Sequence, residues 1–120
     1  MKIYISATMR SGNSLTSNML SIHKDITILM ESFHFFRLFY NFYNPINEKK
    51  NLDKVIYHAY LHLKYRKDII LDVNEVKETM STKAFTYKNV YNSLAESLLK
   101  KTNKKIWGEN CALYWRYIPT

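Results

Sequence analysis

The chain has 120 residues, a length that suits one domain spanning 1–120 and is short for two. Hydrophobic residues make up 47% of it, and only two Gly and two Pro occur, which excludes a disordered or low-complexity chain. Eighteen Lys and Arg against ten Asp and Glu give a net charge of +8, which favours anionic partners such as phosphate or sulfate esters and nucleotides.

The first thirty residues predict a strand, a loop, a helix and a second strand. Residues 2–7 are β-branched and aromatic and indicate a buried strand, and residues 26–30 are a second candidate. Between them, four apolar residues at helical spacing predict one face of a short helix: Leu15, Met19, Leu20 and Ile22. A turn over 23–25 separates this helix from the second strand. Such a strand–helix–strand unit implies a parallel sheet.

The remainder predicts several helices and a third strand. A helix over 33–43 is capped by Ser32 and ended by Asn44-Pro45, and a charged loop over 47–51 leads to a helix over 52–67. The stretch 68–82 is ambiguous, and Asp72 or Asn74 could cap a short helix in it. A long helix capped by Thr86, a strand over 105–109 and a helix or loop over 113–118 follow. We therefore expect an α/β fold with a P-loop-like parallel sheet and flanking helices.

The loop after the first strand carries the residues with the clearest chemistry. Aligned on Gly12, it is a degenerate Walker A loop that lacks the first Gly (Ala7 stands there) and the phosphate-binding Lys (Asn13 stands there). The missing Lys counts against a small-molecule kinase. The loop still combines a strand, a glycine that lets the backbone approach an anion, and a helix N-terminus with free N–H groups. Arg10 adds a charge with bidentate geometry for an oxyanion.

Residues 5–15, Ile-Ser-Ala-Thr-Met-Arg-Ser-Gly-Asn-Ser-Leu, resemble the 5′-phosphosulfate loop of the sulfotransferases that use 3′-phosphoadenosine 5′-phosphosulfate (PAPS). The matching residues are Arg10, Ser11, Gly12, Ser14 and Leu15, and the sequence departs from the pattern at Asn13. Residues 23–26 and the segment Trp107-Gly108-Glu109 are similar to two further segments of this family, although residues 110–112 depart from it. Glu31 lies 21 residues after Arg10, where tyrosylprotein sulfotransferases and related bacterial enzymes carry a catalytic glutamate.

This resemblance implies transfer of a sulfuryl group from PAPS, the donor substrate, to a hydroxyl acceptor without a metal. Residues 11–15 (Ser11, Gly12, Asn13, Ser14 and Leu15) would bind the 5′-phosphate of the donor together with Arg10. Arg10 would stabilise the leaving oxygen, and Glu31 would act as general base. Family members are more than twice as long, and their 3′-phosphate site lies beyond the Trp-Gly-Glu segment. The chain therefore resembles an N-terminal part of such an enzyme, inactive alone if that site is missing.

Three other interpretations of the loop remain open. They are a non-catalytic nucleotide- or anion-binding module, a P-loop small-molecule kinase, and a basic protein that binds nucleic acid or a membrane surface. In the last case, basic residues should be interleaved with the aromatic run over 33–43, but only Arg37 interrupts it. We therefore expect no nucleic-acid partner, and we expect the run to form core and a pocket wall.

Several chemically suggestive residues also have simple structural explanations. Arg10 could be a surface charge, and Glu31 could be an acid at a helix start. Glu109 is expected to be a solvated acid at a strand end, and His34 to be an ordinary helix residue. His58 and His62 have metal-ligand spacing on a helix, but a third ligand is not evident, so no metal is expected.

The remaining composition bears on compartment. The single cysteine, Cys111, rules out a disulfide within the chain and a zinc site built from cysteines. Neither a signal peptide nor an apolar run of the ~20 residues needed for a membrane span is visible. A cytoplasmic protein without a transmembrane segment is expected.

Overall fold

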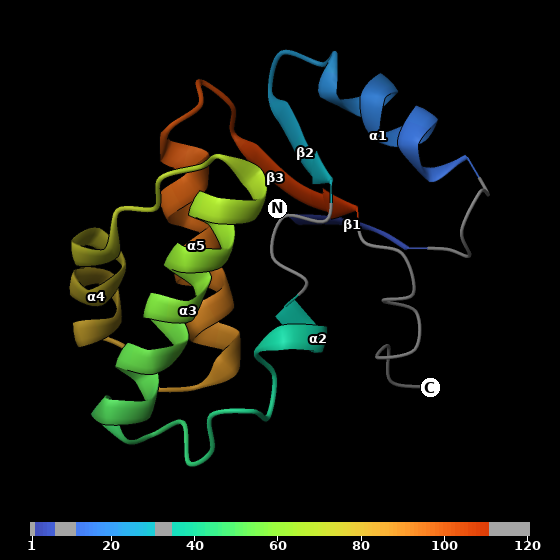
Figure 1. Cartoon of the computed structure of the whole chain (residues 1–120). Helices are drawn as coiled ribbons and strands as arrows, with labels where there is room; N and C mark the ends of the chain where they lie inside the picture. Colours follow the sequence, from blue (N-terminus) through green and yellow to red (C-terminus); the bar gives the residue numbers. More distant parts are fainter. Residues whose placement is uncertain (1, 7–11, 31–34, 111–120) are drawn as a thin grey trace.

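The protein has an α/β fold with a parallel sheet and flanking helices, as the computed structural model in Figure 1 shows. The structure describes residues 2–6, 12–30 and 35–110. The elements in chain order are β1 (Lys2–Ile5), α1 (Asn13–Ser21), β2 (Ile26–Met30), α2 (Phe35–Leu38), α3 (Lys49–Lys67), α4 (Val73–Ser81), α5 (Tyr87–Lys100) and β3 (Ile106–Asn110). Within these ranges, no helix is long and apolar enough to cross a membrane.

The three strands form one parallel sheet in the order β1-β3-β2. The predicted parallel arrangement is therefore confirmed, but β1 and β2 are not neighbours, because the last strand inserts between them. Gly108 at the centre of β3 has Ile3 of β1 on one side and Ile28 of β2 on the other. A Cβ at Gly108 would lie 3.0 Å from the Ile3 carbonyl oxygen and would collide with the Ile28 side chain. This position in the sheet therefore requires a glycine.

The two faces of β3 meet different helices. Trp107 is buried in the core that α3, α4 and α5 form, and Glu109, two residues on, faces the same side and meets Tyr91 of α5. Asn110 faces the opposite side and contacts Ser17 of α1. Figure 1 shows the same division, with α1 on one side of the sheet and the α3–α5 group on the other.

The helical layer follows the predicted apolar spacing closely. Of the six apolar positions at helical spacing in α3, Tyr60 is partly buried and five are buried: Leu52, Val55, Ile56, Ala59 and Leu63. Asp72 is the residue that caps α4, since its carboxylate accepts a hydrogen bond from the Glu75 N–H at 3.1 Å. Thr86 caps α5 as predicted, accepting from the Asn89 N–H at 3.2 Å.

The predicted helix over 33–43 is shorter in the structure. Within the described residues it comprises only α2, Phe35–Leu38, and the chain then turns through Asn41, which has a left-handed φ of 63°. The hydroxyl of Tyr87 ties the turn to α5, because it accepts from the Tyr43 N–H and donates to the Asn44 side chain, both at 3.0 Å. The proposed cap, Ser32, lies outside the described residues.

Three further boundaries differ from prediction. The charged loop over 47–51 is shorter, because α3 begins at Lys49 and the Leu52 N–H already donates to the carbonyl of Glu48 at 3.0 Å. The first strand ends at Ile5, and the third ends at Asn110. The region 113–118 lies outside the part of the chain that the structure describes.

Helix α1 presents the face opposite to the one its apolar pattern predicts. Of the four predicted residues, Leu15, Met19 and Ile22 are 66%, 65% and 83% exposed, and Leu20 is half-buried. The side toward the sheet carries Ser17 and Ser21, four residues apart and therefore on one face. Their hydroxyls make hydrogen bonds to the sheet that apolar residues could not make, which explains why the polar face packs inward.

Candidate functional site

The carboxyl ends of the three parallel strands meet at one edge of the sheet. Ile5 of β1 and Met30 of β2 are both in register with Asn110, the last residue of β3. The loop to α1 leaves this edge after β1, and the segment to α2 leaves it after β2. Ligands of open parallel sheets bind at this edge. Of the predicted site residues, Arg10, Ser11 and Glu31 lie on these connections but outside the described residues.

Gly12 begins the part of the predicted loop that the structure describes. It precedes α1 as its N-cap and has φ 90° and ψ 11°, a left-handed conformation that glycine adopts without strain. Its carbonyl accepts from the N–H of Thr16 at 3.0 Å and from the Thr16 hydroxyl at 3.1 Å. A Cβ built at Gly12 would meet nothing within 4 Å, so the glycine is required by backbone conformation and not by space.

The first turn of α1 carries no acidic side chain, and no side chain caps it at Gly12. Among the described residues, no side chain of the first turn neutralises its N–H groups, which carry the partial positive charge that favours an anion. Asn13 begins the helix, Ser14 is exposed, and Leu15 points its apolar side chain to solvent. Of the predicted binding residues, Gly12, Ser14 and Leu15 are therefore exposed at the start of this helix.

A buried hydrogen bond fixes this helix to the sheet. The side-chain amide of Asn110 donates to the hydroxyl of Ser17 at 2.7 Å, and both side chains are buried. The Ser21 hydroxyl accepts from the backbone N–H of Ile28 on β2 at 3.3 Å. Sequence reasoning missed Ser17 and Asn110 as positioning residues. Their signals were a serine at the centre of a predicted helix and a polar residue at the end of a strand.

Glu109 is not the solvated strand-end acid that the sequence suggested. Its exposure is 0%, and its carboxylate accepts a hydrogen bond from the Tyr91 hydroxyl at 2.9 Å. The reason is topological: β3 is the central strand, with a neighbour on each side and α5 across its face, so its carboxyl end does not reach water. A buried carboxylate at the ligand edge of a sheet is a group that functional sites commonly use.

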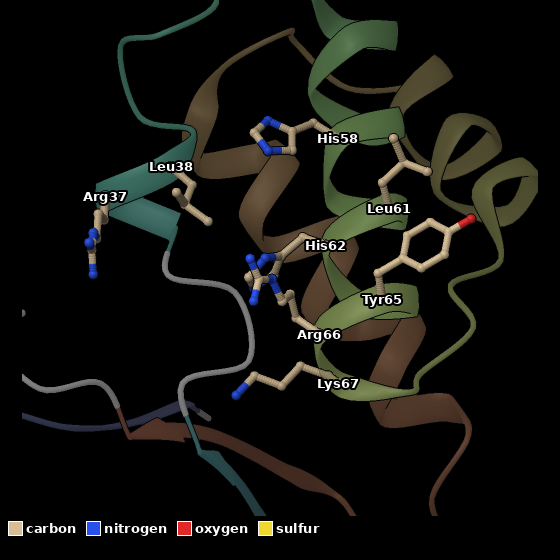
Figure 2. A pocket seen from close by; sticks show the side chains of 8 residues that line it. All are labelled: Arg37, Leu38, His58, Leu61, His62, Tyr65, Arg66 and Lys67. Carbon is tan, nitrogen blue, oxygen red and sulfur yellow. The ribbon is translucent and has the colours of Figure 1, made fainter.

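A cavity of about 670 Å³ lies between α2 and the second half of α3 (Figure 2). Its lining residues are Arg37, Leu38, His58, Leu61, His62, Tyr65, Arg66 and Lys67. The predicted aromatic run therefore contributes Arg37 and Leu38 to the cavity, while its Phe35 and Phe39 are buried in the core as expected. The run's predicted role as core is confirmed for these two rings, but no described aromatic residue from it lines this cavity.

The two histidines of α3 both line this cavity. His58 is hydrogen-bonded through Nδ1 to the Tyr43 hydroxyl, and partial burial lowers the pKa of His58 below its ordinary value. Burial, followed by the negative potential of the Tyr87 hydroxyl, raises the pKa of Tyr43. Among the described residues, no group of three or more His, Cys, Asp and Glu side chains is arranged to hold a metal ion.

Comparison of the chain with family models, with curated proteins and with solved structures finds no match.

Proposed function

We propose that the chain binds PAPS at the β1–α1 loop and transfers its sulfuryl group to a hydroxyl acceptor. In this P-loop-like arrangement, the N–H groups of the first turn of α1 and the side chains of Ser11 and Ser14 bind the 5′-phosphate. Arg10 stabilises the charge that develops on the leaving oxygen, and Glu31 takes the proton of the acceptor hydroxyl. The carboxylate, the arginine and the N–H groups suffice for this chemistry.

The observation that carries the proposal is the left-handed Gly12 at the start of α1. A glycine in this conformation turns the chain so that a loop leaving the carboxyl end of a parallel strand leads directly into an uncapped helix N-terminus. The resemblance of residues 5–15 to the phosphosulfate loop then selects the ligand among possible anions. Position Asn13, which lacks the ammonium group of a Walker Lys, favours PAPS over ATP.

Calorimetric titration with adenosine 3′,5′-bisphosphate tests donor binding. The bisphosphate should bind saturably and more tightly than ATP, and Arg10→Ala should weaken binding by at least about tenfold, because a charge-assisted hydrogen bond is lost. Lys24→Ala is the matched control, since it removes one exposed positive charge from a turn away from the loop and should leave affinity unchanged. Equal binding of ATP and the bisphosphate, or indifference to Arg10→Ala, would contradict the proposal.

A second experiment separates an enzyme from a non-catalytic binding module. In an assay with PAPS and a panel of hydroxyl acceptors, Glu31→Gln should lower kcat by about 10²–10⁴-fold while leaving bisphosphate binding intact. Binding of the bisphosphate without turnover by the unmodified chain would instead favour the module.

A further inference from the structure

The cavity between α2 and α3 concentrates positive charge. The sequence contains four arginines; two lie within the described residues, and both, Arg37 and Arg66, line this cavity together with Lys67. Among the described residues that line the cavity there is no Asp or Glu. Arginine presents a planar set of donors that matches the geometry of carboxylate, sulfate and phosphate groups.

These three charges are not neutralised by the described carboxylates. The described ion pairs join Lys77 to Asp53, Lys83 to Glu96 and Lys100 to Glu75, none of them at the cavity. Like charges gathered around one hollow repel each other and produce a positive potential that an anionic ligand relieves.

The dipole of α3 explains only part of this arrangement. Arg66 and Lys67 lie in the last turn of α3, where positive side chains are favourable for any helix. Arg37, however, comes from α2, which has four residues and lies across the cavity. Figure 2 shows Arg66 and Lys67 directed from α3 toward the side on which α2 lies. The third cation therefore belongs to the cavity and not to the end of α3.

The remaining lining indicates what accompanies the anion. Leu38, Leu61 and Tyr65 provide apolar surface beside the cationic side chains. A volume of about 670 Å³ is within the range of small-molecule sites. These features suit a ring that carries hydroxyl groups and one oxyanion.

Helix α2, which lines the cavity, follows the carboxyl end of β2 after a short stretch of chain. Phe35, the first residue of α2, follows Met30 at the carboxyl end of β2 by five positions, so these residues are at most roughly 18 Å apart. Figure 2 shows the strands of the sheet passing beneath the cavity.

We propose that this cavity binds the acceptor, and that the acceptor is a hydroxyl-bearing ring compound that carries a carboxylate, sulfate or phosphate group. The role of the ligand as acceptor rests on the proposed sulfuryl transfer, whereas the anion site itself is inferred from the lining residues. The oxyanion is held by Arg66 and Lys67, which leaves a hydroxyl group of the ring free to react, and Arg37 adds positive charge at the wall that α2 forms.

Backbone-amide NMR titrations of the full chain at low ionic strength test the site. The probes are glucose 6-sulfate, glucose 6-phosphate and glucuronic acid, with glucose as the neutral comparison. The anionic sugars should shift amides of residues 37–38 and 58–67 saturably, and glucose should bind at least about tenfold more weakly. The relative affinities of the three probes identify the preferred oxyanion. Equal binding of glucose, or no shift at these residues, would overturn the proposal, and this comparison needs no variant.

Variants then test the named side chains. Arg66→Gln and Lys67→Gln should each weaken binding of the preferred probe by about tenfold, and Lys54→Gln, an equal charge change at an exposed position of the same helix, should not. Dispersed amide spectra verify that each variant is folded. Equal weakening by Lys54→Gln would assign the effect to net charge and overturn the site.

Competition with adenosine 3′,5′-bisphosphate distinguishes the two proposals. Simultaneous binding of the bisphosphate and the sugar supports an acceptor site separate from the donor site. Displacement of the sugar by the bisphosphate would overturn it, because the cavity would then hold the donor. Binding of the sugar in a chain that does not bind the bisphosphate would refute the proposed function and the acceptor role while leaving an anion site.

Discussion

Asn110 and Ser17 are 93 residues apart in the chain, yet the amide of the first donates to the hydroxyl of the second at 2.7 Å in the interior. This bond joins the end of the central strand to the middle of α1. Since α1 begins directly after Gly12, the bond also sets where the N-terminus of the helix stands relative to the carboxyl edge of the sheet.

Replacing Ser17 with alanine should destabilise the protein by about 1–3 kcal/mol, because the buried Asn110 amide loses this acceptor. Ser14→Ala, on the exposed side of the same helix, is the control and should change the free energy of unfolding by less than about 0.5 kcal/mol. Urea denaturation measures both. Equal stability of the two variants would mean that the Asn110–Ser17 bond does not contribute.

The two glycines should respond to alanine for different reasons. Gly12→Ala meets no atom but forces alanine into a left-handed conformation, which costs about 1–2 kcal/mol. Gly108→Ala instead places a methyl group against Ile28 and 3.1 Å from the Ile3 Cβ, so overpacking of the sheet should cost about 1–3 kcal/mol.

A compensating substitution separates the two causes. The double variant Ile28→Val/Gly108→Ala should lose less stability than the sum of the losses of the two single variants, because the colliding δ-methyl group of Ile28 is removed. The same substitution should not rescue Gly12→Ala. Thermal and urea unfolding of the three single variants and the two double variants provide the comparison, and strict additivity at Gly108 would refute the steric explanation.

Tyr91→Phe should destabilise the protein by about 1.5–3 kcal/mol. The phenol donates to the side chain of Glu109, which is fully buried, and the loss of a donor to a buried polar group costs stability. Tyr57→Phe, at a largely exposed tyrosine of α3, is the matched control and should be nearly neutral. A loss no greater than that of the control would show that Glu109 does not depend on this donor.

The stability of the protein should fall as the pH drops below about 6.5 because of His58. Burial lowers its pKa in the folded state below the ordinary value of 6.5, so the unfolded chain binds the proton more readily. The stabilising contribution is therefore complete above pH 6.5 and is lost as the pH falls toward the folded-state pKa. Urea unfolding at pH 7.5, 6.5 and 5.5 should show a smaller decline for His58→Gln than for the parent chain. An NMR titration that places the His58 pKa at or above 6.5 would contradict this.

The sequence alone determined those helices and strands that are specified by apolar spacing, by a capping residue or by a run of β-branched residues. The apolar spacing of α3, the cap at Thr86 and the β-branched run over 26–30 each act within a few residues, and each is found where the sequence predicts it. For α4, the pattern left Asp72 and Asn74 as alternatives, and the backbone at Asp72, whose carboxylate reaches the Glu75 N–H, decides between them.

Tertiary structure decided the features that depend on which distant segments meet. The insertion of β3 between β1 and β2 buries Glu109, for which the position at a strand end predicted exposure to water. In α1, the hydroxyls of Ser17 and Ser21 accept hydrogen bonds from the sheet, and Leu15 and Met19 lie on the exposed side of the helix. The cavity likewise joins Arg37 to Arg66 across 29 positions of chain. Contacts between residues this far apart leave no periodic trace in the sequence, because they depend on packing and not on local spacing.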